Sequence, residues 1–469
     1  MNTRDFTNRT FDEIEVGTTA TVTRTLSATD VEALALAAGD VEGFHLDPRA
    51  AGERTTAQGA SAVAMVAGVL NSRFPGPGTR ILESRIRYDG LVNIGDTLTA
   101  TVTAKAKHKH DHTIAFDCRC VNQSGVTLLE GQLTVSAPME RIAYANVATP
   151  ELILRRNDGF AKLFARCQSL PPVTCAVVHP CDKASLSGAI EAAKAGLIIP
   201  ILVGPPAKIR AVAEAEGLDI DPYQIVPVQH SHAAAARAVE IAYAGNADAL
   251  MKGSLHTDEL MAAVVSSTSG LRTNRRVSHV FIMDVPTYPR LLLVTDAAIN
   301  IQPDLEAKVD ICQNAIELAH LLGIERPKVA ILSAVETVNP KIPSTLDAAA
   351  LCKMADRGQI TGGVLDGPLA FDNAISLEAA RTKSIVSPVA GQADILLVPD
   401  LEAGNMLAKQ LQYLAGADAA GIVLGTRVPI VLTSRADTVR TRLASTAVLK
   451  LMAHARRERL AKGTAGADD

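Results

Sequence analysis

Short apolar segments alternate with alanine-rich segments from about Gly159 to the C-terminus, and this alternation constrains the fold more than any other feature. Residues 174–180 read as a strand and are followed by a helical segment at 186–196. Residues 198–204 and 205–217 repeat the same order. Repeated strand–helix units predict a parallel sheet that is covered by helices on both faces.

The pattern changes near Val277, where two apolar segments separated by a Pro-Arg turn predict an antiparallel pair of strands. Strand–helix alternation then resumes, so we expect two α/β lobes with a cleft between them. The predicted boundaries place lobe I at about 159–277 plus 426–469 and lobe II at about 278–425.

The first 140 residues follow a different pattern. An apolar helix is predicted from Ala60 to Leu70, and the segments after it alternate Thr, Val and Ile with polar residues, as antiparallel strands do. One long helix beside an antiparallel meander is an α+β arrangement. We therefore predict a multidomain chain, with an α+β domain at 1–140, a linker at 141–158 and the two-lobed region at 159–469.

Composition excludes several classes of protein. The formal net charge is -4, aromatic residues make up 3% and Trp is absent, which argues against a nucleic-acid partner. No segment approaches the roughly 18 apolar residues of a membrane span. Seven Cys without regular spacing fit reduced thiols, so we expect a cytoplasmic protein. Anionic substrates must then be held by local Arg residues and helix N-termini.

The strongest candidate for catalysis is the segment Ser434-Arg435-Ala436-Asp437, which follows an apolar strand. A guanidinium here can grip phosphate bidentately, and the Ser hydroxyl can hydrogen-bond a thiol or a phosphoryl oxygen. The alternative is an ordinary helix N-cap without catalysis. The residues alone leave both interpretations open.

Other motifs add a resemblance to a known family. The sequences MKGSLHT, GLRTNRRVSHVF, VTDAAINIQPDLEAKVDICQNA, GGVLDGPLAFDNAIS, PDLEAGNM and TSRAD occur in the order found in the phosphate acetyltransferase/phosphate butyryltransferase family, over roughly Gly159 to His454. The resemblance implies a two-lobed transferase, usually a dimer, in which acyl-CoA and phosphate meet in the cleft. It also implies that Ser434 lies near the CoA sulfur and Arg435 on phosphate.

The chain departs from the acetyltransferase pattern in one respect. That pattern has an Asp seven residues after the Ser, where this chain has Thr441, and TSRAD resembles the butyryltransferase branch instead. Asp437 is the substitute candidate for the general base. Its alternative role is favourable charge at a helix N-terminus.

Further substrate-binding candidates come from the same motifs. Three arginines of GLRTNRR are candidates for binding phosphate or the CoA pyrophosphate, although arginines in loops are usually solvated. The polar residues of TDAAINIQPD have helix capping as their alternative. The candidates are Lys252, Thr257, Arg272, Arg275, Arg276, Asp296, Asn300, Asp366 and Asn405.

The N-terminal region carries an Asp and a His five residues apart, Asp40 and His45. Such a dyad can deliver and remove protons while water adds across an activated alkene. Gly59 then opens the apolar helix, whose free N–H groups can polarise a thioester carbonyl. This region resembles the MaoC-like (hot-dog) R-specific enoyl-CoA hydratases, which implies that Asp40 and His45 occupy the acid/base positions.

Three residues depart from the hydratase motif. Glu42 and Gly43 replace its Asn and Pro, and Gln58 replaces the His that precedes the oxyanion-hole Gly. The alternative is therefore a hot-dog domain without catalysis that serves dimerisation or CoA binding. Three alternating His residues at 108, 110 and 112 suggest metal only superficially, and we expect a polar hairpin tip.

The sequence thus predicts a phosphate acyltransferase, with acetyl-CoA as the first choice and butyryl-CoA next, fused to an enoyl-CoA hydratase-like domain. The expected partners are acyl-CoA, inorganic phosphate and enoyl-CoA, with CoA thioesters as substrates and no tightly bound cofactor or metal. A homo-oligomer, a dimer or higher, is expected. The rival hypothesis is that the C-terminal region is a CoA-sensing regulatory module.

Overall fold

The computed structural model describes residues 3–40, 56–57, 59–148, 159–432 and 437–462. The chain divides into two compact units, Met1–Leu154 and Arg155–Asp469. No helix in the described ranges is long and apolar enough to cross a membrane.

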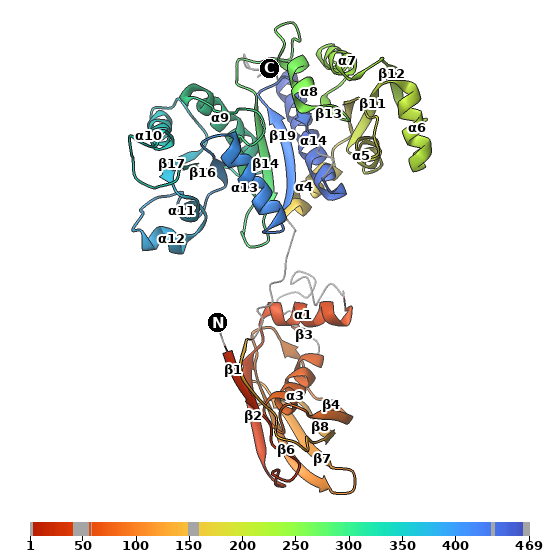
Figure 1. Cartoon of the computed structure of the whole chain (residues 1–469), viewed down its shortest axis with the longest axis vertical. Helices are drawn as coiled ribbons and strands as arrows, with labels where there is room; N and C mark the ends of the chain where they lie inside the picture. The colour runs from red at the N-terminus through yellow and green to blue at the C-terminus, as the bar shows by residue number, and fades with distance from the viewer. Residues whose placement is uncertain (1–2, 41–55, 58, 149–158, 433–436, 463–469) are drawn as a thin grey trace. The chain divides into compact units, whose positions relative to one another are not determined.

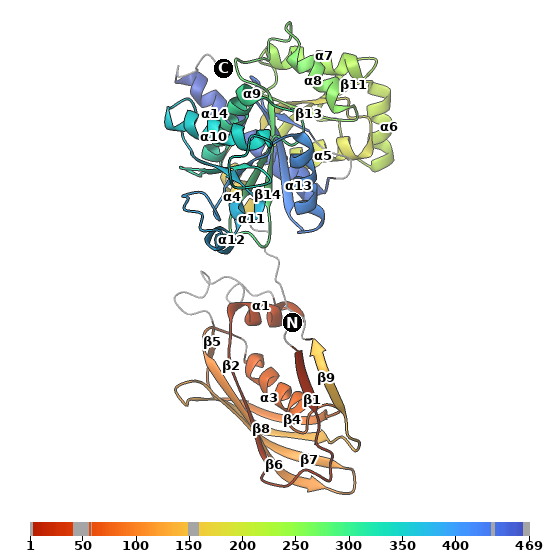
Figure 2. The ribbon, with the colours of Figure 1, turned by 60° about the vertical axis from the view of Figure 1, so that its left-hand side comes forward.

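The first unit is a five-stranded antiparallel sheet that packs one face against helix α3 (Ala60–Ser72), as Figure 2 shows. Helix α1 (Ala28–Ala38) precedes the sheet's long strands, and β3 (Thr56–Ala57) pairs with β5 (Val92–Asn93) apart from the sheet. Buried side chains of α3 meet alternate buried residues of the strands, which forms the core. In spatial order the strands are β2 (Thr19–Thr25), β6 (Thr97–His108), β7 (Thr113–Val121), β8 (Thr127–Ser136) and β4 (Arg80–Tyr88).

The predicted helix is present, and the alternating segments after it form β4, β6, β7 and β8, so the α+β class of this unit is confirmed. Strand β2 and helix α1, which precede them, were not predicted. The three His residues lie where predicted, because β6 ends at His108, β7 begins at Thr113 and His112 has a positive φ in the turn between them. Within the described ranges, no group of three or more metal-ligating side chains is found.

One part of the predicted linker at 141–158 forms a strand instead. Strand β9 (Ala143–Ala148) pairs antiparallel with β1 (Thr3–Thr7), so this segment belongs to the first unit. The pairing joins segments more than 130 residues apart, and a local sequence pattern carries no information on such a distant partner.

The edge strand β2 is joined to β6 by side chains as well as by the backbone. Four pairs of threonine hydroxyls face each other across the two strands, and because they occupy every second position they share one face of the sheet. The pairs are Thr19–Thr103 at 3.0 Å, Thr21–Thr101 at 3.1 Å, Thr23–Thr99 at 3.0 Å and Thr25–Thr97 at 2.9 Å.

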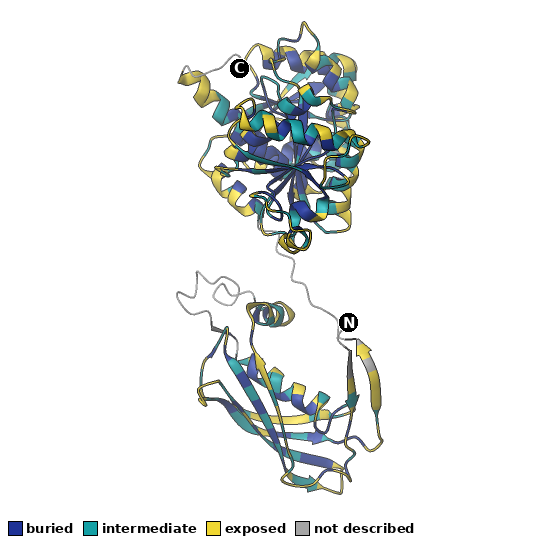
Figure 3. Ribbon diagram, turned by 90° about the vertical axis from the view of Figure 1, so that its left-hand side faces the viewer, coloured by how far each residue is buried: buried dark blue, intermediate teal, exposed yellow. Residues whose placement is uncertain are grey.

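The second unit is built on one eleven-stranded sheet with helices on both faces (Figure 1), and buried strands fill its middle layer (Figure 3). The strand order is β12-β11-β10-β13-β20-β19-β14-β15-β18-β16-β17. The strands are β10 (Val173–Val178), β11 (Ile198–Gly204), β12 (Gln224–Pro227), β13 (Ala249–Lys252), β14 (Ser278–Asp284), β15 (Leu292–Thr295), β16 (Lys328–Leu332), β17 (Val364–Leu369), β18 (Ile395–Leu397), β19 (Asp418–Leu424) and β20 (Ile430–Val431).

Helices connect most of these strands. The longest, α14, packs along β19, where Ser445 Oγ accepts a 2.9 Å hydrogen bond from the backbone N–H of Gly421. The helices are α4 (Gly159–Gln168), α5 (Lys183–Lys194), α6 (Pro206–Glu216), α7 (Ser231–Tyr243), α8 (Thr257–Val265), α9 (Leu305–Leu321), α10 (Pro343–Asp356), α11 (Phe371–Ile375), α12 (Leu377–Thr382), α13 (Leu401–Tyr413) and α14 (Val439–Ala461).

Strand direction reverses within this sheet, and the reversal decides which residues can meet. The strands from β12 to β20 are parallel to one another, whereas β19 is antiparallel to β20 and β14 is antiparallel to both β19 and β15. The strands from β15 to β17 therefore run opposite to those from β12 to β20. As a result, the carboxyl ends of the two sets lie at opposite ends of the sheet.

Candidate functional site

A cavity of about 640 Å³ lies where the loop before β14 meets the loop after β15. All three arginines of the GLRTNRR motif line it, together with Asn300 and Asp304. The structure therefore brings together four of the substrate-binding candidates, namely Arg272, Arg275, Arg276 and Asn300. Three guanidinium groups can bind a phosphate or pyrophosphate group, and three carboxylates, of Asp304, Glu306 and Asp310, line the same cavity and balance their charge.

Arg276 is held by partners on three sides. Its Nε donates a 2.9 Å hydrogen bond to Asn300 Oδ1. Its backbone N–H donates to Asp310 Oδ2 at 2.8 Å, and its backbone carbonyl accepts from Asn314 Nδ2 at 2.9 Å. A side chain oriented in this way loses little further freedom when it binds an anion, which favours binding.

Asp296 lies behind this arginine and orients it indirectly. The carboxylate is buried, at 2% exposure, and accepts hydrogen bonds from the backbone N–H groups of Ala298, Ile299 and Asn300. It also accepts a 2.6 Å hydrogen bond from Asn300 Nδ2, so that Asp296, Asn300 and Arg276 form one chain of hydrogen bonds. Asp296 does not line the cavity, and we interpret it as the carboxylate that fixes the Asn300 amide.

His279 is a nearby residue that sequence reasoning missed. It lies on β14 at 1% exposure, and no hydrogen-bond partner of its Nδ1 is found among the described residues. Burial lowers the pKa of His279 to about 4, although the charge of Asp296 acts in the opposite direction. The imidazole is therefore neutral at pH 7. A lone polar residue in an apolar strand was the only signal in the sequence.

The other two arginines of the motif differ in their surroundings. Arg275 Nη2 lies 2.9 Å from Glu317 Oε1 on α9, and its side chain is 23% exposed. Arg272 is exposed and forms an isolated antiparallel bridge with Thr426 through its backbone. Arg276 and Arg272 therefore present the more accessible side chains to this cavity.

Lys252 and Thr257 lie elsewhere. Lys252 ends β13, and its Nζ donates to the carbonyl oxygens of Gly253 and Leu255 at 3.3 and 3.2 Å, while Thr257 begins α8. Strands β13 and β14 run in the same direction, and Arg276 precedes β14 whereas Lys252 closes β13. These candidates are thus at opposite ends of their strands, and neither Lys252 nor Thr257 lines the arginine-lined cavity.

Asn405 and Asp366 also lie outside the lining. Asn405 Nδ2 donates to the carbonyl of Ala297 at 3.1 Å, so it ties α13 to the loop that carries Asn300. Asp366 lies on β17, the last strand of the sheet, and its Oδ1 accepts a 2.9 Å hydrogen bond from the N–H of Gly367. Three strands separate positions on β17 from the loop before β14.

The catalytic candidates Ser434 and Arg435 lie outside the described residues. Asp437 precedes Thr438, the N-cap of α14, and its carbonyl accepts from Arg442 Nη1 at 2.9 Å. Thr441 is buried, and its hydroxyl lies 3.0 Å from that of Thr438, so it belongs to the cap of this helix. The role of Asp437 as a general base stays a prediction.

Two residues of the predicted hydratase site, Gly59 and Asp40, lie in the described part of the first unit. Gly59 is the N-cap of α3, and a Cβ added there would lie 2.9 Å from Cδ1 of the Tyr88 ring. Asp40 directly follows the C-cap of α1, and its N–H donates to the carbonyl of Ala35 at 2.8 Å. His45 lies outside the described residues. Tyr88 is 56% exposed, and its ring lies beside Gly59 at the N-terminus of α3.

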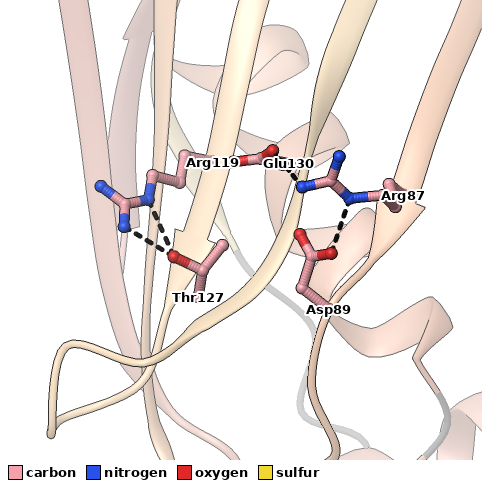
Figure 4. Close-up of polar contacts among 5 residues, drawn as sticks. All are labelled: Arg87, Asp89, Arg119, Thr127 and Glu130. Carbon is pink, nitrogen blue, oxygen red and sulfur yellow. Dashed lines mark hydrogen bonds and ion pairs between the residues drawn. The ribbon is translucent and has the colours of Figure 1, made fainter.

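Charged residues on the opposite face of this sheet are paired with each other (Figure 4). Arg87 donates to Glu130 at 2.5 Å and to Asp89 at 2.6 Å, and Arg119 Nη2 donates to Thr127 Oγ1 at 2.6 Å. The Arg87 side chain is 71% exposed, so these ion pairs contribute little stability. We assign this face no role in catalysis.

Comparisons with known proteins agree with this architecture. Residues 229–449 match the family described as "Phosphate acetyl/butaryl transferase", and residues 11–123 match the MaoC like domain. The phosphate acetyltransferase of Rhizobium meliloti is 66% identical over 298 residues, which are 64% of this chain and 94% of that protein. The phosphate butyryltransferase of Clostridium acetobutylicum is 43% identical over 295 residues, covering 63% of this chain and 98% of that protein.

A solved structure supports the same assignment. The branched-chain phosphotransacylase from Enterococcus faecalis V583 is 31% identical, with a TM-score of 0.53, and the match covers 60% of this chain and 99% of that one. The transferase relatives match about two thirds of the chain, and the MaoC-like region accounts for most of the remainder. This chain belongs to the phosphate acetyl/butaryl transferase family and carries a MaoC-like hot-dog domain before its transferase unit.

Proposed function

We propose that this chain transfers a short acyl group between coenzyme A and inorganic phosphate. The observation that carries the proposal is the Asp296–Asn300–Arg276 chain of hydrogen bonds, which holds a guanidinium at a cavity lined by two further arginines. Fixed guanidinium groups at such a site bind the anionic phosphate groups of a substrate. Membership of the phosphate acetyl/butaryl transferase family indicates that the reaction at this site is acyl transfer between CoA and phosphate.

In the proposed reaction, a phosphate oxygen attacks the thioester carbonyl carbon and a C–O bond forms. The C–S bond then breaks, and the sulfur leaves as a thiolate that takes up a proton to give the CoA thiol. Arg276 and its neighbours are proposed to bind phosphate groups of CoA, while Ser434 and Arg435 are expected to act at the sulfur and the inorganic phosphate. Positioning and charge compensation account for catalysis of this kind without a metal.

Acetyl is the proposed acyl group. The identity of 66% to a phosphate acetyltransferase exceeds the 43% to a phosphate butyryltransferase, which favours the shorter chain. Butyryl remains the alternative, because TSRAD resembles that branch and Thr441 occupies the position of the acetyltransferase Asp.

The decisive test is an assay of CoA thiol release from acetyl-, propionyl- and butyryl-CoA with the full chain and inorganic phosphate. We expect turnover that requires phosphate, with the highest kcat/KM for acetyl-CoA. Binding of acyl-CoA without turnover of any of the three would reject the transferase and favour the CoA-sensing module.

A second activity is proposed for the first unit, on the basis of its MaoC-like match and the Asp40 and His45 pair. Its substrate would be an enoyl-CoA that is hydrated to a 3-hydroxyacyl-CoA. We expect crotonyl-CoA hydration by the full chain and its loss in Asp40→Asn. Equal rates for the parent and the variant would remove Asp40 from catalysis and favour a domain that serves oligomerisation.

We further propose a cytoplasmic homo-oligomer that requires no tightly bound cofactor. The reduced state expected of the Cys residues supports the location. The resemblance to the acyltransferase family supports the oligomer, and the absence of a metal from the proposed chemistry supports the lack of a cofactor. Light scattering of the purified chain measures the oligomer, and activity that survives dialysis against a chelator is the expected result for the cofactor.

A further inference from the structure

The order of the parallel strands reverses between β10 and β13. The chain runs from β10 to β11 and then to β12 on one side, and it later returns to place β13 on the other side of β10. In open sheets of this kind, ligands bind beyond the carboxyl ends of the strands at the point where the order reverses. The residues directly after β10 and β13 therefore occupy the place in this half of the sheet that is best suited to a ligand.

His179 directly follows β10 and is held by the segments after both neighbouring strands. Its backbone carbonyl accepts from the N–H of Ser254 at 2.8 Å, and its Nδ1 lies 2.9 Å from the carbonyl oxygen of Ser254. On the other side, its backbone N–H donates to the carbonyl of Val203 on β11 at 2.7 Å. Gly253 permits this close approach, because a Cβ added there would lie 2.7 Å from the carbonyl oxygen of His179. The position of the imidazole is thus fixed by the surrounding backbone.

The backbone of His179 itself is strained. Its φ is 55°, in the left-handed region that Gly and Asn adopt more readily than other residues. Strained residues of this kind persist where the surrounding structure holds them, and they cluster at functional sites. An imidazole at such a position calls for a role in function.

The hydrogen bond to Ser254 determines which ring nitrogen of His179 carries the proton. A carbonyl oxygen only accepts, so Nδ1 donates, and in the neutral ring Nε2 carries a lone pair. Among the described residues Nε2 forms no hydrogen bond, and the side chain is partly exposed. An oriented imidazole with an accessible Nε2 can accept a proton from a substrate and return it.

His179 also shares its end of the sheet with two motifs of the acyltransferase family. Val178 lies opposite Lys252, and β20 pairs with β13 directly beside this position, so β10, β13 and β20 end at the same edge. In the sequence, MKGSLHT continues from β13 and TSRAD follows β20. The imidazole is therefore placed at the strand ends from which these motifs extend.

We propose that Nε2 of His179 carries the proton between phosphate and the sulfur of CoA, an inference that rests on the proposed acyltransferase function. In acyl phosphate synthesis, Nε2 takes the proton of the attacking phosphate hydroxyl as the C–O bond forms. It gives this proton to the sulfur as the C–S bond breaks. In the reverse direction, Nε2 takes the proton of the CoA thiol and returns it to the phosphate oxygen that leaves. One proton is exchanged, and no further reactant is needed.

His179→Asn in the full chain tests the proposal. Asn tolerates the left-handed conformation, and its amide N–H can donate to the Ser254 carbonyl in place of Nδ1, but it cannot accept and return a proton. We expect kcat for CoA release from acetyl-CoA and phosphate to fall about 100-fold, with KM for acetyl-CoA within about twofold of the parent value. Thermal denaturation should match that of the parent.

His454→Asn is the matched control. His454 is also partly exposed, and its Nε2 lies 2.9 Å from the carbonyl oxygen of Pro171, near the start of β10 and so at the opposite end of that strand. This variant should turn over as the parent does.

Chemical rescue separates proton transfer from a purely structural role. His179→Gly retains the left-handed backbone and leaves space for a free imidazole. Added imidazole should raise kcat of this variant at least about tenfold, because it restores the acid–base group, and it should leave the parent unchanged.

Turnover by His179→Asn within about twofold of the parent would overturn the inference, since general acid–base catalysis contributes about 100-fold or more. A folded His179→Gly that imidazole does not activate would also overturn it. A large loss in Asp437→Asn beside parent-like turnover in His179→Asn would assign the proton transfer to Asp437 instead. A parent without turnover rejects the proposed function, whereas an active parent with an active His179→Asn rejects this inference alone.

Discussion

At the scale of single residues, the orientation of Arg276 depends on hydrogen bonds from residues that do not themselves need to contact a ligand. Asp296 is buried and accepts four N–H groups, and it reaches the cavity only through Asn300 and Arg276. Asp310 and Asn314, both on α9, hold the backbone of Arg276. On a helix with an ordinary amphipathic pattern, such residues look like solvated polar positions, and the sequence therefore gave no reason to select them.

Arg276→Gln should lower kcat/KM for acyl transfer by roughly 10- to 100-fold, because the loss of a charged hydrogen bond to an anionic substrate group costs about 2 kcal/mol. Asn300→Leu should lower it less, since the guanidinium stays but loses its orientation. The double variant should then resemble Arg276→Gln alone, and additive losses would contradict the indirect role of Asn300. Arg210→Gln is the control for loss of a surface charge.

His279 predicts a pH dependence of stability. Its pKa is near 6.5 when the chain is unfolded and about 4 when folded, because burial disfavours the charged form. The unfolded chain therefore binds a proton that the folded chain does not, so the stability present above pH 6.5 is lost as the pH falls toward 4. The free energy of unfolding should therefore be lower at pH 5 than at pH 7.

Urea denaturation of the parent and of His279→Gln at pH 7 and pH 5 measures this contribution. The variant should lose less of its unfolding free energy between the two pH values than the parent does. An equal loss in both proteins would assign the pH dependence to other groups.

At the scale of elements, α13 is fitted closely to the loop that carries Asn300. A Cβ added to Gly404 would lie 2.6 Å from the carbonyl oxygen of Asp296 and 2.8 Å from Cγ2 of Val398. Asn405, the next residue, donates to Ala297 in the same loop. The glycine is therefore required by the close approach of this helix, and the following asparagine joins the two segments.

Gly404→Ala should destabilise the second unit by about 2 kcal/mol and reduce acyl transfer, because the helix must move away from the loop. Thermal denaturation and the CoA-release assay measure both effects. Gly68→Ala in α3 adds the same methyl group with no atom within 4 Å, and it should be neutral or stabilise the protein by about 1 kcal/mol. Equal stability of the two variants would contradict the packing argument.

The sequence predicted the elements better than their arrangement. Period-two and strand–helix patterns located β4, β6, β7 and β8 of the first unit and most strands of the second, including the antiparallel pair β14 and β15, because burial imposes these periods locally. Strands β1, β2, β9 and β19 were not predicted. The reversal of direction between the two halves of the sheet could not be predicted, since strand order is a non-local property. Lys252 and Arg276 consequently lie at opposite ends of their strands, although both come from motifs of the same family.

At the scale of the whole molecule, the two units have separate cores and separate matches to known families. A chain that starts at Arg155 should fold and keep acyl transfer within about threefold of the parent, because the units are compact on their own. Circular dichroism and the CoA-release assay test this. Loss of activity with intact folding would show that the first unit contributes to the transferase.

The pairing of β1 with β9 makes the first unit suitable for circular permutation. Thr3 lies opposite Ala148, so the beginning and the end of this unit are neighbours in space. A short peptide can bridge such neighbours, and a circular permutant with new termini in the turn between β7 and β8 should fold. The same proximity makes the unit suited to insertion as a cassette into a loop of another enzyme.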